Sequence, residues 1–279
     1  MALDLKAVGK PMGPFVKEYQ WKDVVLYALG VGAGFPELEY CYEKRLKVIP
    51  TFAIAAVFDF FFRVAASSRA NLAGILHGGQ DLVFHHPIPV SGTLTTEGRI
   101  TGYVDKGAAR GALVTAESLT RHTSGQPLFT SRFTLFSRLD GGFGGEDAPA
   151  QTVAFPDRAP DIAAADRPSP DQPLIYRLSG DLFELHADPG FARTAGFERP
   201  IMHGLCTLGF ACRALVHHLA PGAPEKVRRI ACRFSKPLYP GVPIRTLIWS
   251  TGPGTALWKT VTADGGDEII TGGLFEYGR

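Results

Sequence analysis

The chain has 279 residues, of which 45% are hydrophobic and 20% charged, and its formal net charge is +2. That length suits one large domain or two of ordinary size, and the composition is that of a soluble globular protein. Basic and acidic residues are spread along the chain, so neither a basic tract for nucleic acid nor a disordered acidic tail is expected.

The four cysteines form no C-x-x-C pair, which favours free thiols in a reducing compartment. The N-terminal segment lacks the long apolar core of a secretory signal. The most apolar stretch, residues 52–62, is too short to span a bilayer, so no membrane association is expected. The last residues carry no peroxisomal address. Together these features predict a cytoplasmic protein.

In chain order, the first long apolar segment is residues 51–67, which is hydrophobic nearly all round and predicts a buried helix. Residues 205–219 have the same character in the second half. Strand-like runs broken by turn signals follow each helix, at residues 92–103, 111–119 and 128–136 and then at 229–235, 244–250, 256–263 and 268–276. The order predicts an α+β protein in which a curved antiparallel sheet wraps round one buried helix, twice over.

The two halves are separated by a change in composition. A glycine-rich stretch, residues 141–145, precedes residues rich in Ala, Pro and Asp, which have little to bury and cannot sustain a helix through their prolines. We interpret residues 141–172 as a linker between an N-terminal unit, residues 1–140, and a C-terminal unit, residues 173–279.

Short matches recur in the same order in both halves. Tyr27 and Tyr176 each stand in a Leu/Ile-Tyr-x-Leu run, and the pair His77-Gly78 resembles His203-Gly204. Chance could produce matches this short, but their common order favours two faint copies of one structural unit.

The segment from Tyr176 to His186 holds the most informative side chains. Asp181 and His186 are five residues apart, so a bend in the chain can bring the carboxylate and the imidazole round one water molecule. Such a pair can move a proton between water and carbon, and Gly180 permits the backbone geometry that the bend needs. The plainer alternatives are a Gly-Asp turn or helix cap and a structural histidine.

Gly204 lies immediately before the second buried helix. Its N–H would stand at a helix N-terminus, where donors are unsatisfied and the helix dipole is positive. A growing enolate oxygen on a thioester requires such a donor. No zinc-type spacing, phosphate loop or dinucleotide fingerprint is present, so neither a metal nor a cofactor is expected.

These features resemble the type 2, (R)-specific enoyl-CoA hydratases, also called MaoC-like dehydratases, over nearly the whole chain. The matching segments are residues 23–33, 42–44, 50–52, 77–80, 103–107, 134–136, 141–145, 178–181, 186–189, 195–197, 200–209 and 233–237. The resemblance implies a double hot-dog fold, with the catalytic machinery in the second unit and a first unit that widens the acyl-binding space. Counted from Tyr27 and Tyr176, Gly32 holds the place of Asp181. The resemblance also implies a homodimer.

The resemblance carries roles to matching positions. Asp181 and His186 would form the acid–base pair, and the Gly204 N–H would bind the thioester carbonyl. Positions that would contact an acyl-CoA substrate are His77, Gly78, Lys106 and Phe234. A lysine suits a coenzyme A phosphate. Lys106 could equally be a solvated turn lysine beside Asp105, and Phe234 a buried strand aromatic.

One departure concerns the family pattern Asp-x-Asn-Pro-x-His, in which Phe183 replaces the asparagine and Glu184 the proline. Phenylalanine cannot hydrogen-bond a water molecule, and the loss of one such bond costs on the order of 2 kcal/mol, about thirty-fold in rate. A loss of that size still leaves an active enzyme. Hydration of trans-2-enoyl-CoA to (3R)-3-hydroxyacyl-CoA is therefore kept as the leading hypothesis. The alternatives are an acyl-CoA-binding protein with weak or no turnover and a hot-dog thioesterase. Within an active enzyme, Phe183 could instead reshape the ligand site for a different acyl group, or Glu184 could take over a polar role.

Overall fold

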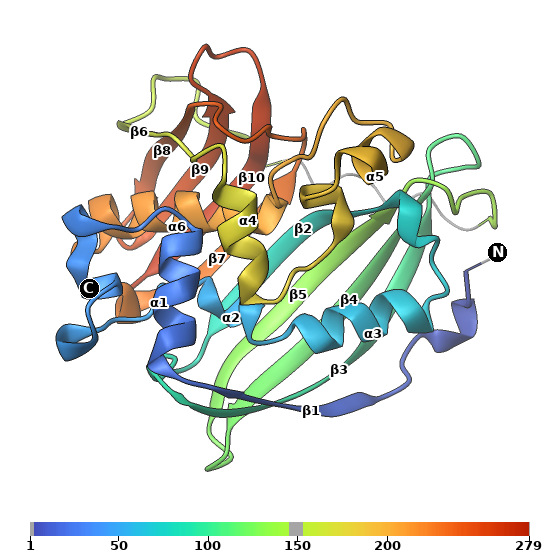
Figure 1. The fold of residues 1–279 in the computed structure, drawn as a ribbon, viewed down its shortest axis with the longest axis horizontal. Helices are drawn as coiled ribbons and strands as arrows, with labels where there is room; N and C mark the ends of the chain where they lie inside the picture. Colours follow the sequence, from blue (N-terminus) through green and yellow to red (C-terminus); the bar gives the residue numbers. More distant parts are fainter. Residues whose placement is uncertain (1–2, 145–152, 279) are drawn as a thin grey trace.

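The computed structural model describes residues 3–144 and 153–278. Its strands form one ten-stranded sheet in the order β1-β3-β4-β5-β2-β7-β10-β9-β8-β6 (Figure 1). The first five strands in space come from the N-terminal half and the other five from the C-terminal half. The strands are β1 Met12–Tyr19, β2 Ile75–Phe84, β3 Gly92–Asp105, β4 Ala112–His122, β5 Pro127–Ser137, β6 Ile162–Asp166, β7 Val227–Phe234, β8 Ile244–Gly252, β9 Thr255–Thr262 and β10 Glu268–Tyr277.

All seven strands expected from the sequence are present, each within a few residues of its predicted bounds. Strand β4 shows the reason, because its residues alternate between buried and partly exposed along most of its length. Successive side chains of a strand point to opposite faces, so this alternation is what a sheet with one covered face requires. The α+β prediction with antiparallel strands is confirmed.

The two halves are joined edge to edge. Strands β2 and β7 pair antiparallel, with Gln80 opposite Cys232. Across this junction, Arg229 donates two hydrogen bonds of 2.9 Å to the carboxylate of Asp81. The two expected sheets are therefore one continuous sheet, because the edge strand of each unit satisfies the other's backbone groups.

Helices cover one side of this sheet, with α3 over the first unit's strands and α6 over the second unit's (Figure 1). They are α1 Trp21–Gly30, α2 Phe52–Ala55, α3 Phe58–Ser67, α4 Gln172–Tyr176, α5 Pro189–Thr194 and α6 Gly204–Leu219. Ten of the sixteen residues of α6 are buried, as its all-round apolar sequence predicted. Within the described residues, none of the helices has the length and apolar character needed to cross a membrane.

The single helix predicted at residues 51–67 is wrong, because the chain breaks between α2 and α3. At Val57 the backbone leaves the helical region, with φ −122° and ψ 15°. The break lets the two parts bury different faces. Residues of α2 pack in the core that they share with α6, while Phe60 and Val64 of α3 pack in a second core under β3–β5.

Three strands were not predicted from the sequence. β1 contains Pro14, β2 contains two glycines and Asp81, and β6 lies inside the predicted linker. β6 pairs with β8, and Trp249 donates a hydrogen bond of 2.9 Å to the carbonyl of Arg158. The second part of residues 141–172 is therefore attached to the C-terminal unit, not an open linker. Residues 145–152 lie outside the described residues, and the unit boundaries stay a prediction.

The internal repeat has a structural counterpart in α1 and α4, which pack against each other between the two central helices. The rings of Tyr27 and Tyr176 are both fully buried, and their centroids lie 5.9 Å apart. The other proposed match is wrong, since His77-Gly78 lies within β2 whereas His203-Gly204 begins α6.

Candidate active site

The three residues predicted to carry the chemistry line one cavity. Asp181 follows α4, His186 ends a short 3-10 turn, and Gly204 begins α6. The cavity has a volume of about 240 Å³ and is mainly apolar. Its wall comes from both units and includes Phe61, Phe62, Leu72, Ile75, Leu76, His77, Gly78, Phe136, Phe183, Phe197, Ile201, Met202, Thr207, Phe234, Ser235, Lys236 and Leu238.

Asp181 is a half-buried carboxylate at a sharp bend. Gly180 has φ +130°, a backbone conformation that favours glycine. One carboxylate oxygen of Asp181 accepts a hydrogen bond of 3.3 Å from the Phe183 N–H. Burial raises the pKa of Asp181 to about 6, although this hydrogen bond and the charge of Arg177 oppose the shift. The carboxylate is therefore mostly ionised at neutral pH but gains a proton far more readily than an exposed aspartate.

His186 is held as one neutral tautomer. Its Nδ1–H donates a hydrogen bond of 2.9 Å to the carbonyl oxygen of Ile201. Burial lowers the pKa of His186 to about 4. A neutral imidazole that donates from Nδ1 carries its lone pair on Nε2. At neutral pH the site therefore offers two proton acceptors, the Asp181 carboxylate and His186 Nε2.

Gly204 supplies a backbone donor beside this pair. It is the first residue of α6, where an N–H has no partner within the helix. A Cβ added at Gly204 would lie 3.0 Å from a ring carbon of Phe234. A side chain at residue 204 would therefore press on Phe234, and glycine leaves the amide open to a ligand.

His203 completes the cluster, and the sequence analysis had not assigned it a role. One side-chain ligand atom each of Asp181, His186 and His203 lie within 4.8 Å of one another. The two imidazole rings are stacked, with centroids 3.8 Å apart and planes inclined by 28°. A metal ion must lie near the plane of each imidazole at about 2 Å from its nitrogen. Rings stacked face to face do not meet that requirement at one ion, so the geometry suits proton transfer better.

Four further predicted residues line the cavity: His77, Gly78, Phe183 and Phe234. His77 is hydrogen-bonded to Gln80 at 3.1 Å and stacks on Phe61, with ring centroids 5.2 Å apart. Burial lowers the pKa of His77 to about 4, so it is neutral at neutral pH. Its neutral ring therefore serves as part of the cavity wall.

Lys106 lies in the turn after β3 and is not among the residues that line the cavity. Its contact with coenzyme A stays a prediction. Lys236, which the sequence analysis did not single out, does line the cavity and is paired with Asp267. Its signal in the sequence was only a lysine before Pro237 within a matching segment.

Phe183 contributes an aromatic edge where the family pattern has an amide. Its ring meets that of His186 edge to face at 6.2 Å and that of Phe191 at 5.3 Å. Glu184 is exposed and does not line the cavity, so it does not replace the missing amide. Asp181 and His186 therefore have an apolar neighbour at this position.

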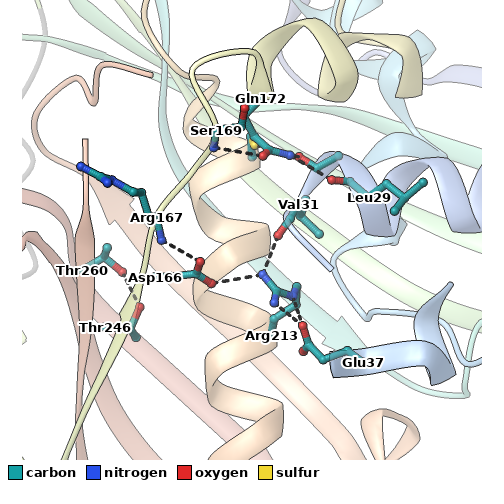
Figure 2. A network of polar contacts seen from close by, with 12 residues as sticks. Leu29, Val31, Glu37, Asp166, Arg167, Ser169, Gln172, Arg213, Thr246 and Thr260 are labelled. Carbon is teal, nitrogen blue, oxygen red and sulfur yellow. Dashed lines mark hydrogen bonds and ion pairs between the residues drawn. The ribbon is translucent and has the colours of Figure 1, made fainter. Parts of the chain in front are cut away.

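The corresponding place in the first unit has lost this chemistry. By the offset between Tyr27 and Tyr176, Gly32 stands for Asp181 and Glu37 for His186. Arg213 of α6 fills the space, bonding to Glu37, to the carbonyl of Val31 at 2.9 Å and to Asp166 at 3.2 Å (Figure 2). A Cβ added at Gly32 would lie 2.3 Å from a ring carbon of Phe210 and 3.0 Å from this guanidinium, so both side chains of α6 occupy the space. The first unit therefore has an ion network at the place where the second unit has Asp181 and His186.

Comparison with known proteins agrees with this architecture. Residues 17–139 match the MFE-2 hydratase 2 N-terminal domain, and residues 150–272 match the MaoC like domain. A structure from Mycobacterium tuberculosis described as having a double hotdog fold shares the fold at a TM-score of 0.62 and 15% identity, covering 97% of this chain and 96% of the other. The fold is a double hot dog.

Similarity to individual proteins extends over the whole chain. The chain is 40% identical to 3-hydroxyacyl-thioester dehydratase Y of Mycobacterium tuberculosis, covering 99% of each chain. It is 36% identical to a probable enoyl-CoA hydratase 2 of Dictyostelium discoideum, covering 98% and 96%. A MaoC-like dehydratase from Phytophthora capsici superimposes with a TM-score of 0.88 at 31% identity, covering 99% and 98%. The chain belongs to the MaoC-like, hydratase 2 family.

Proposed function

We propose that this protein catalyses the reversible hydration of a trans-2-enoyl-CoA to a (3R)-3-hydroxyacyl-CoA. The observation that carries the proposal is the meeting of Asp181, His186 and the Gly204 amide in one mainly apolar cavity. Relatives named enoyl-CoA hydratase and 3-hydroxyacyl-thioester dehydratase support the same class of reaction.

In this mechanism a water molecule donates its two hydrogens to the Asp181 carboxylate and to His186 Nε2. Its oxygen lone pair then faces Cβ of the substrate. The C–O bond forms at Cβ while one water proton passes to the pair, and the C=C electrons move towards the thioester. The pair returns that proton to Cα on the same face. The net change is addition of one water molecule, and the reverse sequence is dehydration.

The Gly204 N–H stabilises the charge that develops on the thioester oxygen. A backbone donor at a helix N-terminus is already oriented, so no reorganisation is needed as charge grows. The apolar walls strengthen this hydrogen bond, since they exclude water from around the oxygen.

The experiment is a panel of enoyl-CoA substrates, from crotonyl-CoA to longer and aromatic enoyl groups, assayed by loss of the enoyl absorbance. We expect turnover by the wild type and loss of turnover in Asp181→Asn and His186→Gln. Asp188→Asn, at an exposed helix cap, is the matched control. Folded protein that hydrates no member of the panel, or that releases free coenzyme A instead, would contradict the proposal.

A second candidate, an acyl-CoA-binding protein with weak turnover, rests on Phe183, which cannot hold a water molecule. Calorimetry with a saturated acyl-CoA distinguishes the two. Tight binding without hydration, together with hydration that appears in Phe183→Asn, would favour the binding protein. The expected homodimer remains a prediction for either function.

A further inference from the structure

His203 contacts both Asp181 and His186 but does not line the cavity. It is the residue before α6 and is 1% exposed. It is not among the residues that line the cavity, so a ligand there would not touch it. Its ring stacks on His186, and its Nε2–H donates a hydrogen bond of 3.2 Å to the backbone carbonyl of Asp181.

His203 is also held in place by contacts with α4 and α6. The ring of Tyr176, which ends α4, lies 4.8 Å from that of His203. The backbone of His203 is fixed by α6, because its carbonyl accepts from both the N–H and the hydroxyl of Thr207 at 3.1 and 3.3 Å. His186, in contrast, stands at the end of a three-residue turn. The stack therefore ties a residue on a short turn to two helices.

The fold does not require an imidazole at this place. The first unit has Gly32 and Glu37 in place of the pair, and there the residue before α2 is Thr51. Tyr27 is the first unit's counterpart of Tyr176, and the two rings pack against each other with centroids 5.9 Å apart. His203 also keeps a buried Nδ1 without a partner among the described residues, an arrangement that is unfavourable for stability. His203 is thus present in the unit that has Asp181 and His186, and its unpartnered nitrogen does not help the fold. Both observations point to a role in catalysis.

We propose that His203 is a positioning residue that fixes the ring plane of His186 and the backbone of Asp181 round the reacting water. The inference rests on the proposed hydration. Misplacing a reacting group by about 1 Å can cost on the order of 100-fold in rate, so holding a pair of groups on a turn and a bend has a direct effect on turnover.

Two variants separate the two contacts. His203→Phe keeps a stacked ring and removes the hydrogen-bond donor, whereas His203→Gln keeps a donor and removes the ring. We expect kcat to fall about 10- to 100-fold in each, with KM within about twofold, because His203 does not line the cavity. Cys212→Ala, at a buried residue within α6, is the control for lost packing and should retain kcat.

A double-mutant cycle then tests whether His203 acts through His186. In a His186→Gln background, His203→Phe should cause little further loss of kcat, since residues that act as a unit are not additive. Unchanged kcat in both single variants, a rise in KM that accounts for the loss, or losses that add in the double variant would overturn the proposal.

A spectroscopic readout does not depend on turnover. Long-range ¹H–¹⁵N spectra of the imidazoles should show one sharp set of His186 resonances in the wild type and exchange-broadened resonances in His203→Gln, because the stacked ring no longer holds the plane of His186. A wild type without turnover would contradict the hydration hypothesis. His186 resonances that stay equally sharp in both variants would contradict the role of His203 whether or not turnover is seen.

Discussion

The ring of Phe234 lies against Gly204, so that a Cβ on residue 204 would stand 3.0 Å from its nearest ring carbon. Phe234 also lines the cavity. A side chain at residue 204 must therefore move the ring, the helix start or both, and either movement displaces the amide that would bind the thioester oxygen.

We predict that Gly204→Ala lowers kcat at least about tenfold, approaching the 10²- to 10³-fold loss seen when one oxyanion donor is removed. Steady-state kinetics on the preferred enoyl-CoA measures this. Gly252→Ala is the matched control, because a Cβ there meets nothing within 4 Å. Equal kcat in the two variants would show that residue 204 is not the donor.

Asp181→Asn should stabilise the fold while abolishing turnover. Burial raises the pKa of Asp181 from 3.8 to about 6, so the folded protein binds this proton more tightly than the unfolded chain does. The associated stability is complete below about pH 4 and is lost as pH rises through 6. At neutral pH the ionised carboxylate therefore costs up to about 3 kcal/mol, which the amide would recover. Urea denaturation at pH 7 measures the gain, and Asp188→Asn, which keeps a helix cap, should show little change. A destabilised Asp181→Asn would contradict the raised pKa of Asp181.

The rate should depend on pH with an acid limb near 6. The mechanism needs Asp181 as a proton acceptor, and its pKa is raised to about 6. His186, with a pKa of about 4, stays neutral across this range. We therefore expect kcat/KM to fall as pH drops from 7 to 5, with a midpoint near 6. A pH profile that stays flat down to pH 5 would mean that the carboxylate is not needed in its ionised form.

Phe183→Asn should raise kcat by up to about thirty-fold, because an amide adds the missing hydrogen bond to the water. The same change removes the edge-to-face contact with Phe191, so stability should fall by about 1–3 kcal/mol. Phe183→Leu is the control that reduces the aromatic contact without adding a donor or acceptor. If Phe183→Leu and Phe183→Asn raised kcat equally, the increase would come from the smaller side chain and not from a new hydrogen bond.

Arg213→Met should destabilise the protein and leave kcat per folded molecule unchanged. The side chains of Arg213 and Glu37 are only 11% and 15% exposed, and removing one partner of a buried ion pair costs about 3–5 kcal/mol. Arg132→Met gives the comparison, since the Arg132 and Glu117 side chains are 52% and 31% exposed and such pairs contribute about 0–1 kcal/mol. A large loss of kcat at full folding would place Arg213 in the chemistry.

Much of the fold could be predicted because apolar patterning marks buried helices and half-buried strands directly. The failures occur where tertiary contacts decide. β2 pairs on both edges, and its Asp81 is neutralised by Arg229 from the other unit. Nothing near Asp81 in the sequence reveals that partner. The break at Val57 likewise depends on two cores that share one helical segment.

The candidate site was easier to predict than its support. Asp181, His186 and Gly204 lie within one stretch of chain and match a spaced pattern, and the structure brings all three to one cavity. His203 had a weaker signal, since a polar residue before an apolar helix is usually a cap. Only the structure shows that its ring stacks on the ring of His186.

The continuous sheet across β2 and β7 joins two copies that are covalently one chain. In a dimer of identical single units, every substitution appears twice, so a change that improves one pocket is imposed on the other. Fusion removes that constraint. One half can keep Asp181, whose burial weakens the fold, together with His186, while the other has Gly32 and Glu37 at the matching positions and pairs Glu37 with Arg213. If the proposed hydration holds, the two halves of one chain divide catalysis and structural support between them.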